Sequence, residues 1–232
     1  MGPFFSKDLR RYLKQTRELY GDELFLDLKK THSTDGRISE KNAGEYSHGK
    51  LDEYKFKIDK CQKCDLGSTR NKFVFGVGDP GASLLLVGEA PGAEEDKVGQ
   101  PFVGRAGKLL DKILTAIKRD RFRDVYICNV LKCRPPSNRD PLAGEVESCE
   151  PHLLHQIHLI KPKLIVALGR VAGMTLLNVD KPLKTMRGII HDYHGTPLIV
   201  TYHPAALLRN SNWKPEAWKD FKWIKSILDE KN

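Results

Sequence analysis

The sequence predicts an α/β fold of three layers, in which a central sheet of four parallel strands lies between helices. Four short runs rich in Val, Ile and Leu have the composition of strands that are buried on both faces. These runs are 83–87, 125–130, 163–168 and 197–201. Segments with the apolar spacing of helices separate them. Because strands and helices alternate, the sheet is expected to be parallel and covered on both faces.

The stretch before the first strand predicts an appendage to one compact domain. Residues 7–20 have the apolar spacing of an amphipathic helix, which Gly21 ends. Residues 29–50 are rich in Ser, Thr, Gly, Lys and Glu, a composition typical of a mobile linker. We therefore predict a helical extension and linker over 1–50 and a compact domain over 51–232.

The first strand ends at Gly88 and is followed by a long turn rich in Gly, Pro and acidic residues. Five glycines occur from Gly88 to Gly107, both included, which indicates a backbone shaped closely around a partner. Ligand sites of parallel sheets lie at the carboxyl ends of strands, and loops of this length are usually functional. The turn is thus the main candidate site, and a merely long connection is the alternative.

Four helices are expected after this turn. Apolar residues recur at helical spacing over 108–118, 144–160, 170–177 and 216–228. The last of these segments carries the aromatic residues Trp218, Phe221 and Trp223. We expect these rings to pack in the core rather than to form a stacking surface for bases.

Composition restricts the class of protein. The hydrophobic content of 40% is ordinary for a soluble protein, and no apolar run approaches the roughly 20 residues of a membrane helix. The net charge of +9 favours an anionic partner such as nucleic acid. Charged residues interrupt the start of the chain, so no export signal is recognised. With five cysteines, an odd number, we expect a reducing, cytoplasmic compartment.

Four of the cysteines indicate a metal centre. Cys61 and Cys64 are separated by two residues, so both thiolates can bind one metal from a single turn. Cys133 and Cys149 would complete a set of four, which suits zinc or an iron–sulfur cluster. Their wide spacing favours iron–sulfur, although unliganded thiols remain an alternative for these two. Cys128 lies inside a strand and is expected to be a core residue.

Two further segments follow predicted strands. Asn129 ends the second strand, where its amide can present donors and an acceptor to a planar ligand, or simply cap a loop. His203 follows the fourth strand, where an imidazole can donate to developing negative charge, or serve a structural role. Leu207, Leu208 and Arg209 come next and are candidates for insertion into a DNA duplex and for binding a phosphate.

Together these segments resemble the iron–sulfur uracil-DNA glycosylases, the fourth family of their superfamily. The motifs at 88–107, 129–136 and 203–205 occur in the family's order, and the resemblance covers about 54–228. It implies that 51–232 is a catalytic domain that removes uracil from single- or double-stranded DNA. It further implies a monomer that works in the cytoplasm with the nucleoid and has no membrane partner.

The resemblance also implies roles for individual residues. Phe102 would stack on the uracil, Asn129 would read its polar edge, and His203 would donate to the carbonyl oxygen that gains negative charge. Glu89 would help to organise the attacking water. Glu95 would stand near C5 of the pyrimidine, where thymine carries its methyl group.

The remaining implied residues border the substrate or hold the cofactor. Gly88 and Ala90 would line the substrate site. Ala90 stands where the best-known members of the superfamily have a water-orienting Asp, an absence that the fourth family shares. Residues 181–188 contain no histidine, so covalent trapping of uracil, known from a related branch, is not expected. A 4Fe-4S cluster of structural role would be held near the N-terminal part of the domain by Cys61, Cys64, Cys133 and Cys149.

Two other functions remain open at this point. One is a non-catalytic, four-cysteine metal protein that binds DNA. The wide cysteine spacing and the three strand-end motifs count against this function. The other is a nucleotide hydrolase, which the Gly-rich turn would allow. The sequence contains no Gly-x-x-x-x-Gly-Lys-Ser/Thr phosphate loop.

Overall fold

The computed structural model describes residues 40–230, with side chains described from residue 49 onward. The helix predicted over 7–20 lies outside this range. Helix α2 (Glu40–Ile58) begins inside the segment predicted as a linker, so the last part of that segment is helical. The polar composition of this segment hides the helix, which packs through Leu51, Tyr54 and Ile58 against the core.

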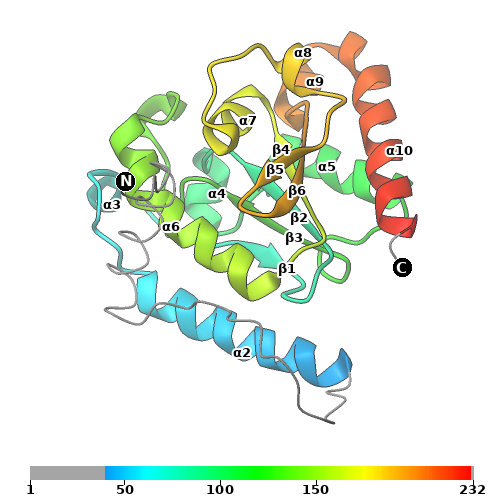
Figure 1. The fold of residues 1–232 in the computed structure, drawn as a ribbon. Coiled ribbons are helices and arrows are strands. Elements are labelled where there is room, and N and C mark those ends of the chain that lie inside the picture. The colour runs from blue at the N-terminus through cyan, green and yellow to red at the C-terminus, as the bar shows by residue number, and fades with distance from the viewer. Residues whose placement is uncertain (1–39, 231–232) are drawn as a thin grey trace, which may run out of the picture. The chain divides into compact units, whose positions relative to one another are not determined.

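The central sheet has six strands in the order β1-β3-β2-β4-β6-β5, rather than the four that were expected (Figure 1). The inner strands pair in parallel and are β2 (Leu84–Gly88), β3 (Val125–Asn129), β4 (Leu164–Leu168) and β6 (Thr196–Thr201). The two outer strands pair antiparallel and are β1 (Val77–Gly78) and β5 (His191–Tyr193). Both are too short to give a hydrophobic pattern.

Helices cover both faces of the sheet, so the architecture has three layers. One face carries Leu85 and Val87 and packs against α2, α6 (Ala143–Ile160), α7 (Arg170–Leu177) and α8 (Leu183–Met186). The opposite face carries Leu84 and Leu86 and packs against α5 (Arg105–Ala116) and α10 (Lys214–Glu230). Neighbouring side chains of a strand point to opposite faces, and both faces are covered by apolar helix residues. The strand sequences are therefore apolar throughout.

Shorter elements occupy the connections. They are α3 (Leu66–Thr69), α4 (Ala93–Val98), α9 (Pro204–Arg209) and the 3₁₀ turns η1 (Pro136–Asn138) and η2 (Ser211–Trp213). Helix α4 lies inside the turn that the sequence predicts as a loop. On α10, Phe221 is buried as expected, whereas Trp218 is 38% exposed and is not a core residue.

The order of the strands creates a crevice at one edge of the sheet. Strand β2 lies between β3 and β4, so the chain leaves β2 toward one side and later returns on the other. Ligands of open α/β sheets bind at such a switch point, outside the carboxyl ends of the strands. Among residues 40–230, no helix is both long and apolar enough to span a bilayer.

Candidate active site

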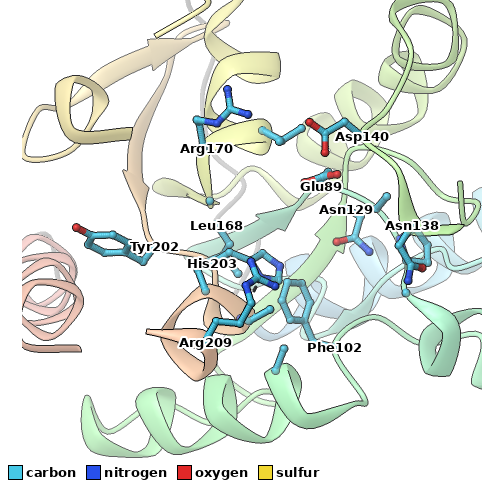
Figure 2. A pocket seen from close by; sticks show the side chains of 18 of the residues that line it. Glu89, Phe102, Asn129, Asn138, Asp140, Leu168, Arg170, Tyr202, His203 and Arg209 are labelled. Atoms are coloured by element: carbon cyan, nitrogen blue, oxygen red, sulfur yellow. Dashed lines mark hydrogen bonds between the residues drawn. The ribbon is translucent and has the colours of Figure 1, made fainter. Parts of the chain in front are cut away.

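A cavity of about 790 Å³ opens at the carboxyl ends of the four parallel strands. Its lining includes Glu89 after β2, Asn129 at the end of β3, Leu168 at the end of β4 and His203 after β6. Figure 2 shows the side chains of Phe102, Asn129 and His203 gathered around one space. The cavity thus brings together all three residues that the sequence places at different strand ends.

Phe102 is buried at the wall of this cavity, beside His203. Its ring centroid lies 5.4 Å from that of the imidazole, with 31° between the ring planes. Its backbone has a φ of 54°, a left-handed conformation that is uncommon for a residue with a bulky side chain. Arg121 holds this backbone: its Nη1 donates to the Phe102 carbonyl oxygen at 3.0 Å, and its Nη2 donates to that of Pro101 at 2.9 Å.

Two glycines of the turn are required by contacts within the protein. A Cβ at Gly88 would lie 2.3 Å from Oδ1 of Asn129 and 2.8 Å from the Phe102 ring. A Cβ at Gly107 would lie 1.7 Å from the Phe102 carbonyl oxygen. At both positions glycine lets the chain approach Phe102 or Asn129 closely. The sequence indicated close packing here, but the neighbour is the protein itself.

Glu95 lines the cavity and also fixes the turn that carries Phe102. Its Oε1 accepts hydrogen bonds from the backbone N–H groups of Val103 at 3.0 Å and Gly104 at 3.1 Å. Gly104 is the N-cap residue of α5, where a carboxylate is favourable. The carboxylate therefore ties α4 to the beginning of α5, with Phe102 between them.

His203 is positioned by the helix that it begins. Its Nδ1 accepts a hydrogen bond from the backbone N–H of Ala205 at 3.1 Å. The pKa of the His203 imidazole is lowered to about 4, mainly by burial; Arg209 contributes to the shift, and Glu95 opposes it. The ring is thus neutral at neutral pH. Because Nδ1 is an acceptor, Nε2 carries the proton and can donate a hydrogen bond.

Asn129 and Glu89 form the opposite side of the cavity. Asn129 is only 2% exposed, and its amide points into the space between Glu89 and Asn138 (Figure 2). Burial raises the pKa of the Glu89 carboxyl to about 7, with a contribution from the negative charge of Asp140 that Arg170 opposes. A carboxyl with a pKa near neutrality can exchange protons at physiological pH. No motif in the sequence indicates Asp140 or Arg170 as site residues.

An ion-pair network holds the chain just before His203. Arg187 donates to Asp220 from Nε at 2.8 Å and from Nη2 at 3.0 Å, and its guanidinium lies 4.3 Å from the Tyr202 ring centroid. Thr201 donates its hydroxyl to the same carboxylate at 2.5 Å. The strand end that leads to His203 is therefore fixed to α10. No sequence pattern connects Arg187 with Asp220, since the fold alone brings them together.

The segment proposed for insertion into DNA divides into buried and exposed residues. Leu207 is 2% exposed, because α9 turns this side chain into the protein. This burial counts against the expectation that Leu207 enters DNA. Leu208 is 39% exposed, and Arg209 is exposed and lines the cavity.

The four predicted metal-binding cysteines are all free thiols, and each of them influences, or is influenced by, another member of the set electrostatically. Cys64, Cys133 and Cys149 belong to one apolar cluster. The pKa of Cys149 is raised to about 12, mainly by burial; Lys132 opposes this shift, and Cys133 and Cys64 add to it. Burial also raises the pKa of Cys133, with smaller contributions from Cys64 and Cys61. Cys128 is fully buried within β3, as a core residue would be.

Nitrogen groups surround these sulfur atoms. Nη1 of Arg70 donates to Sγ of Cys133 at 3.4 Å, and the backbone N–H of Lys132 donates to Sγ of Cys149 at 3.3 Å. Nε2 of His152 lies 3.4 Å from Sγ of Cys61. In the part of the chain that the structure describes, no three His, Cys, Asp or Glu side chains stand close enough to hold a single metal ion.

Comparison with known proteins identifies the family. Residues 75–222 match the family model of the uracil DNA glycosylase superfamily. The chain is 43% identical over 189 residues to a type-4 uracil-DNA glycosylase of Archaeoglobus fulgidus, covering 78% of this chain and 94% of that protein. It is 46% identical over 158 residues to the type-4 enzyme of Thermotoga maritima, covering 66% of this chain and 81% of that protein.

A third relative of the same type comes from Sulfurisphaera tokodaii. It is 42% identical over 185 residues, covering 76% of this chain and 84% of that protein. The match extends across every strand end that lines the cavity. The chain belongs to the type-4 family of the uracil-DNA glycosylase superfamily.

Proposed function

We propose that this protein is a DNA repair glycosylase that rotates uracil out of DNA and hydrolyses its N-glycosidic bond, which leaves an abasic site. The observation that carries this proposal is the meeting of Phe102, Asn129 and His203 at one cavity. An aromatic ring, an amide and a neutral imidazole are the groups that a planar pyrimidine needs for stacking, for reading its polar edge and for activating its carbonyl oxygen. Family membership supports the same activity.

DNA binding must offset the cost of extracting the base. Rotating uracil out of the duplex costs a few kcal/mol in lost stacking and pairing. The net charge of +9 favours contacts with phosphates. Leu208 is exposed beside the cavity and can fill the gap in the base stack, while Arg209 can hold a phosphate. Single- and double-stranded DNA are both proposed substrates.

Uracil recognition is assigned to the walls of the cavity. The Phe102 ring stacks on the base, and the Asn129 amide pairs with its polar edge. Glu95 stands on the side proposed to face C5, where a methyl group would be excluded. Ala90 forms the adjoining wall. Gly88 packs against Asn129 and Phe102, where a side chain would clash with both, so it is proposed to shape the substrate site through these two residues.

Bond cleavage separates charge, and the site has groups that can stabilise both parts. The bond between C1′ of the sugar and N1 of the base breaks, and its electron pair stays on the base as negative charge. The Nε2–H of His203 donates to the carbonyl oxygen that gains this charge. Glu89 as a carboxylate accepts a proton from water, whose oxygen bonds to C1′. The products are the uracil anion and the abasic sugar.

We assign Cys61, Cys64, Cys133 and Cys149 to a 4Fe-4S cluster. The four thiols are near one another, yet no compact group fits a single ion, and a four-iron cluster keeps its thiolates further apart than one zinc ion does. Nitrogen donors close to three of the sulfurs fit a site for thiolates, because hydrogen bonds to sulfur are part of such sites. When bound, the cluster would supply a structural link between the region of α3 and α6.

The proposal is tested with a uracil-containing oligonucleotide. Cleavage at the abasic site after alkali treatment, with no cleavage of a matched thymine oligonucleotide, is the expected result. Binding of the DNA without cleavage would favour a non-catalytic binding module. Assays of single-stranded and double-stranded substrates test the strand preference. Gel filtration tests the proposed monomer. The proposed cytoplasmic location with the nucleoid is tested by fractionation.

A further inference from the structure

Lys132 lies in the chain between Asn129 and Cys133, and its side chain is 0% exposed. Its Nζ is 2.7 Å from the backbone carbonyl oxygen of Asn129 and 2.5 Å from Oε1 of Gln156. It also forms a hydrogen bond with the thiol of Cys128. Fully buried lysines are rare unless they are paired, so this arrangement requires an explanation.

The neighbouring groups fix the direction of these hydrogen bonds. A backbone carbonyl can only accept, and Nε2 of Gln156 donates to the Phe75 carbonyl oxygen at 2.9 Å, which turns Oε1 toward Lys132. An ammonium group has three donors, and three acceptors surround it. Yet all three are neutral groups, since burial raises the pKa of Cys128 above its ordinary value. A buried charge with only neutral partners is costly.

The missing negative charge is available at the cysteine site. The backbone N–H of Lys132 already donates to Sγ of Cys149 at 3.3 Å, and Cys133 is the next residue in the chain. Four thiolates around a 4Fe-4S cluster carry more negative charge than the iron core neutralises. A cluster at this site would therefore act as counter-charge to the buried ammonium.

We propose that Lys132 is a positioning residue that couples the cysteine site to the base-reading residue Asn129. The ammonium holds the carbonyl oxygen of Asn129 at the carboxyl end of β3, and the thiolates of the cysteine site stabilise the ammonium in its buried position. The orientation of the Asn129 amide then depends on a filled cysteine site. The inference rests on the proposed function, because it uses the proposed roles of Asn129 and of the four cysteines.

The test compares Lys132→Met with Lys222→Met in the full chain. Methionine keeps most of the side-chain volume but has no donor and no charge, and Lys222 is an exposed lysine on α10. Three quantities are measured on iron-loaded protein: the single-turnover rate of uracil excision, the dissociation constant for uracil-containing DNA, and the reduction potential of the cluster. A displaced amide is expected to slow excision by about 10- to 100-fold, with less than about twofold change in DNA affinity.

The reduction potential separates coupling from a general loss of structure. Removing a nearby positive charge disfavours addition of an electron to the cluster, so Lys132→Met is expected to shift the potential to a more negative value. Lys222→Met is expected to match the wild-type protein in all three quantities. Wild-type values for both rate and potential in Lys132→Met would overturn the coupling.

Two further results keep the outcomes distinct. If Lys132→Met does not fold, Gln156→Met removes one acceptor and leaves the ammonium. Slower excision with retained iron is then the supporting result, and a wild-type rate overturns the coupling. A wild-type protein that excises uracil but contains no iron contradicts the cofactor and the coupling together. If the wild-type protein contains iron and the Lys132→Met variant has an unchanged excision rate and reduction potential, the coupling is contradicted but the cofactor is not.

Discussion

The ring of Phe102 lies 5.4 Å from the ring of His203, with 31° between the two planes. The two residues come from the turn after β2 and from the end of β6, and β4 lies between these strands in the sheet. A base that stacks on Phe102 is thereby brought beside the imidazole. The sheet, rather than any local motif, sets this geometry.

The rate of excision should depend on pH through Glu89. Because the pKa of this carboxyl is raised to about 7, the carboxylate that accepts the proton from water is lost as pH falls below 7. We expect the wild-type single-turnover rate to fall about tenfold per pH unit below this value and to level off above it. Glu89→Gln should be slow with no inflection near pH 7. A wild-type inflection that persists in Glu89→Gln would assign the titration to another group.

The same carboxyl should make the fold less stable at high pH. Its pKa is about 7 when folded and 4.5 ordinarily, so between these values the folded state binds a proton that the unfolded state has released. Stability therefore decreases as pH rises through this window and stays reduced above it. Glu89→Gln should have a higher Tm than the wild-type protein at pH 8 and nearly the same Tm at pH 4, as measured by calorimetry. A lower Tm at pH 8 would contradict burial as the cause of the shift.

Arg121 should matter for catalysis although it lies outside the cavity lining. Two of its hydrogen bonds hold the carbonyl oxygens of Pro101 and Phe102, and Phe102 has a left-handed backbone that costs about 1–3 kcal/mol to maintain. We expect Arg121→Met to raise the KM for uracil-containing DNA by about tenfold. Arg123→Met removes the same charge from a side chain that is 81% exposed. An equal KM in the two variants would show that Arg121 does not position Phe102.

Substitution of Leu208 should affect excision from duplex DNA, whereas substitution of Leu207 should affect the stability of the fold. Leu208→Ala removes the exposed side chain and should slow excision from duplex DNA more than from single-stranded DNA, because only the duplex requires the gap to be filled. Leu207→Ala creates a cavity and should reduce the free energy of unfolding by about 2–5 kcal/mol, with the ratio of the two excision rates unchanged. Urea unfolding and paired excision assays measure both effects. A duplex-specific defect in Leu207→Ala would reverse the assignment.

The sequence predicts the inner part of the fold well, because those strands are buried on both faces. The runs at 84–88, 125–129 and 164–168 are buried throughout. Asn129 and Leu168 line the cavity at the ends of two of them, and Glu89 lines it directly after the other. Strands β1 and β5 have two and three residues, too few for any periodicity. Helix α2 begins in a polar stretch whose packing residues start only at Leu51.

The residues that support the site could not be predicted from the sequence, for a different reason. Asn129 and His203 stand at strand ends, and Phe102 lies within the motif that follows β2, so pattern and resemblance identify them. Arg121 and Lys132 act through contacts that exist only after the strands have paired. Arg121 follows α5 as one of several arginines, and Lys132 reads as a surface residue until its complete burial is seen.

The most direct measurement of the base pocket is the single-turnover rate of uracil excision by His203→Ala and Asn129→Ala. Each variant removes one polar group from the proposed contact with the base, and loss of one such donor slows reactions by about 100- to 1,000-fold. We expect a loss of this size in both variants, with an unchanged circular dichroism spectrum. A near wild-type rate in either variant would show that its side chain does not act on the departing base.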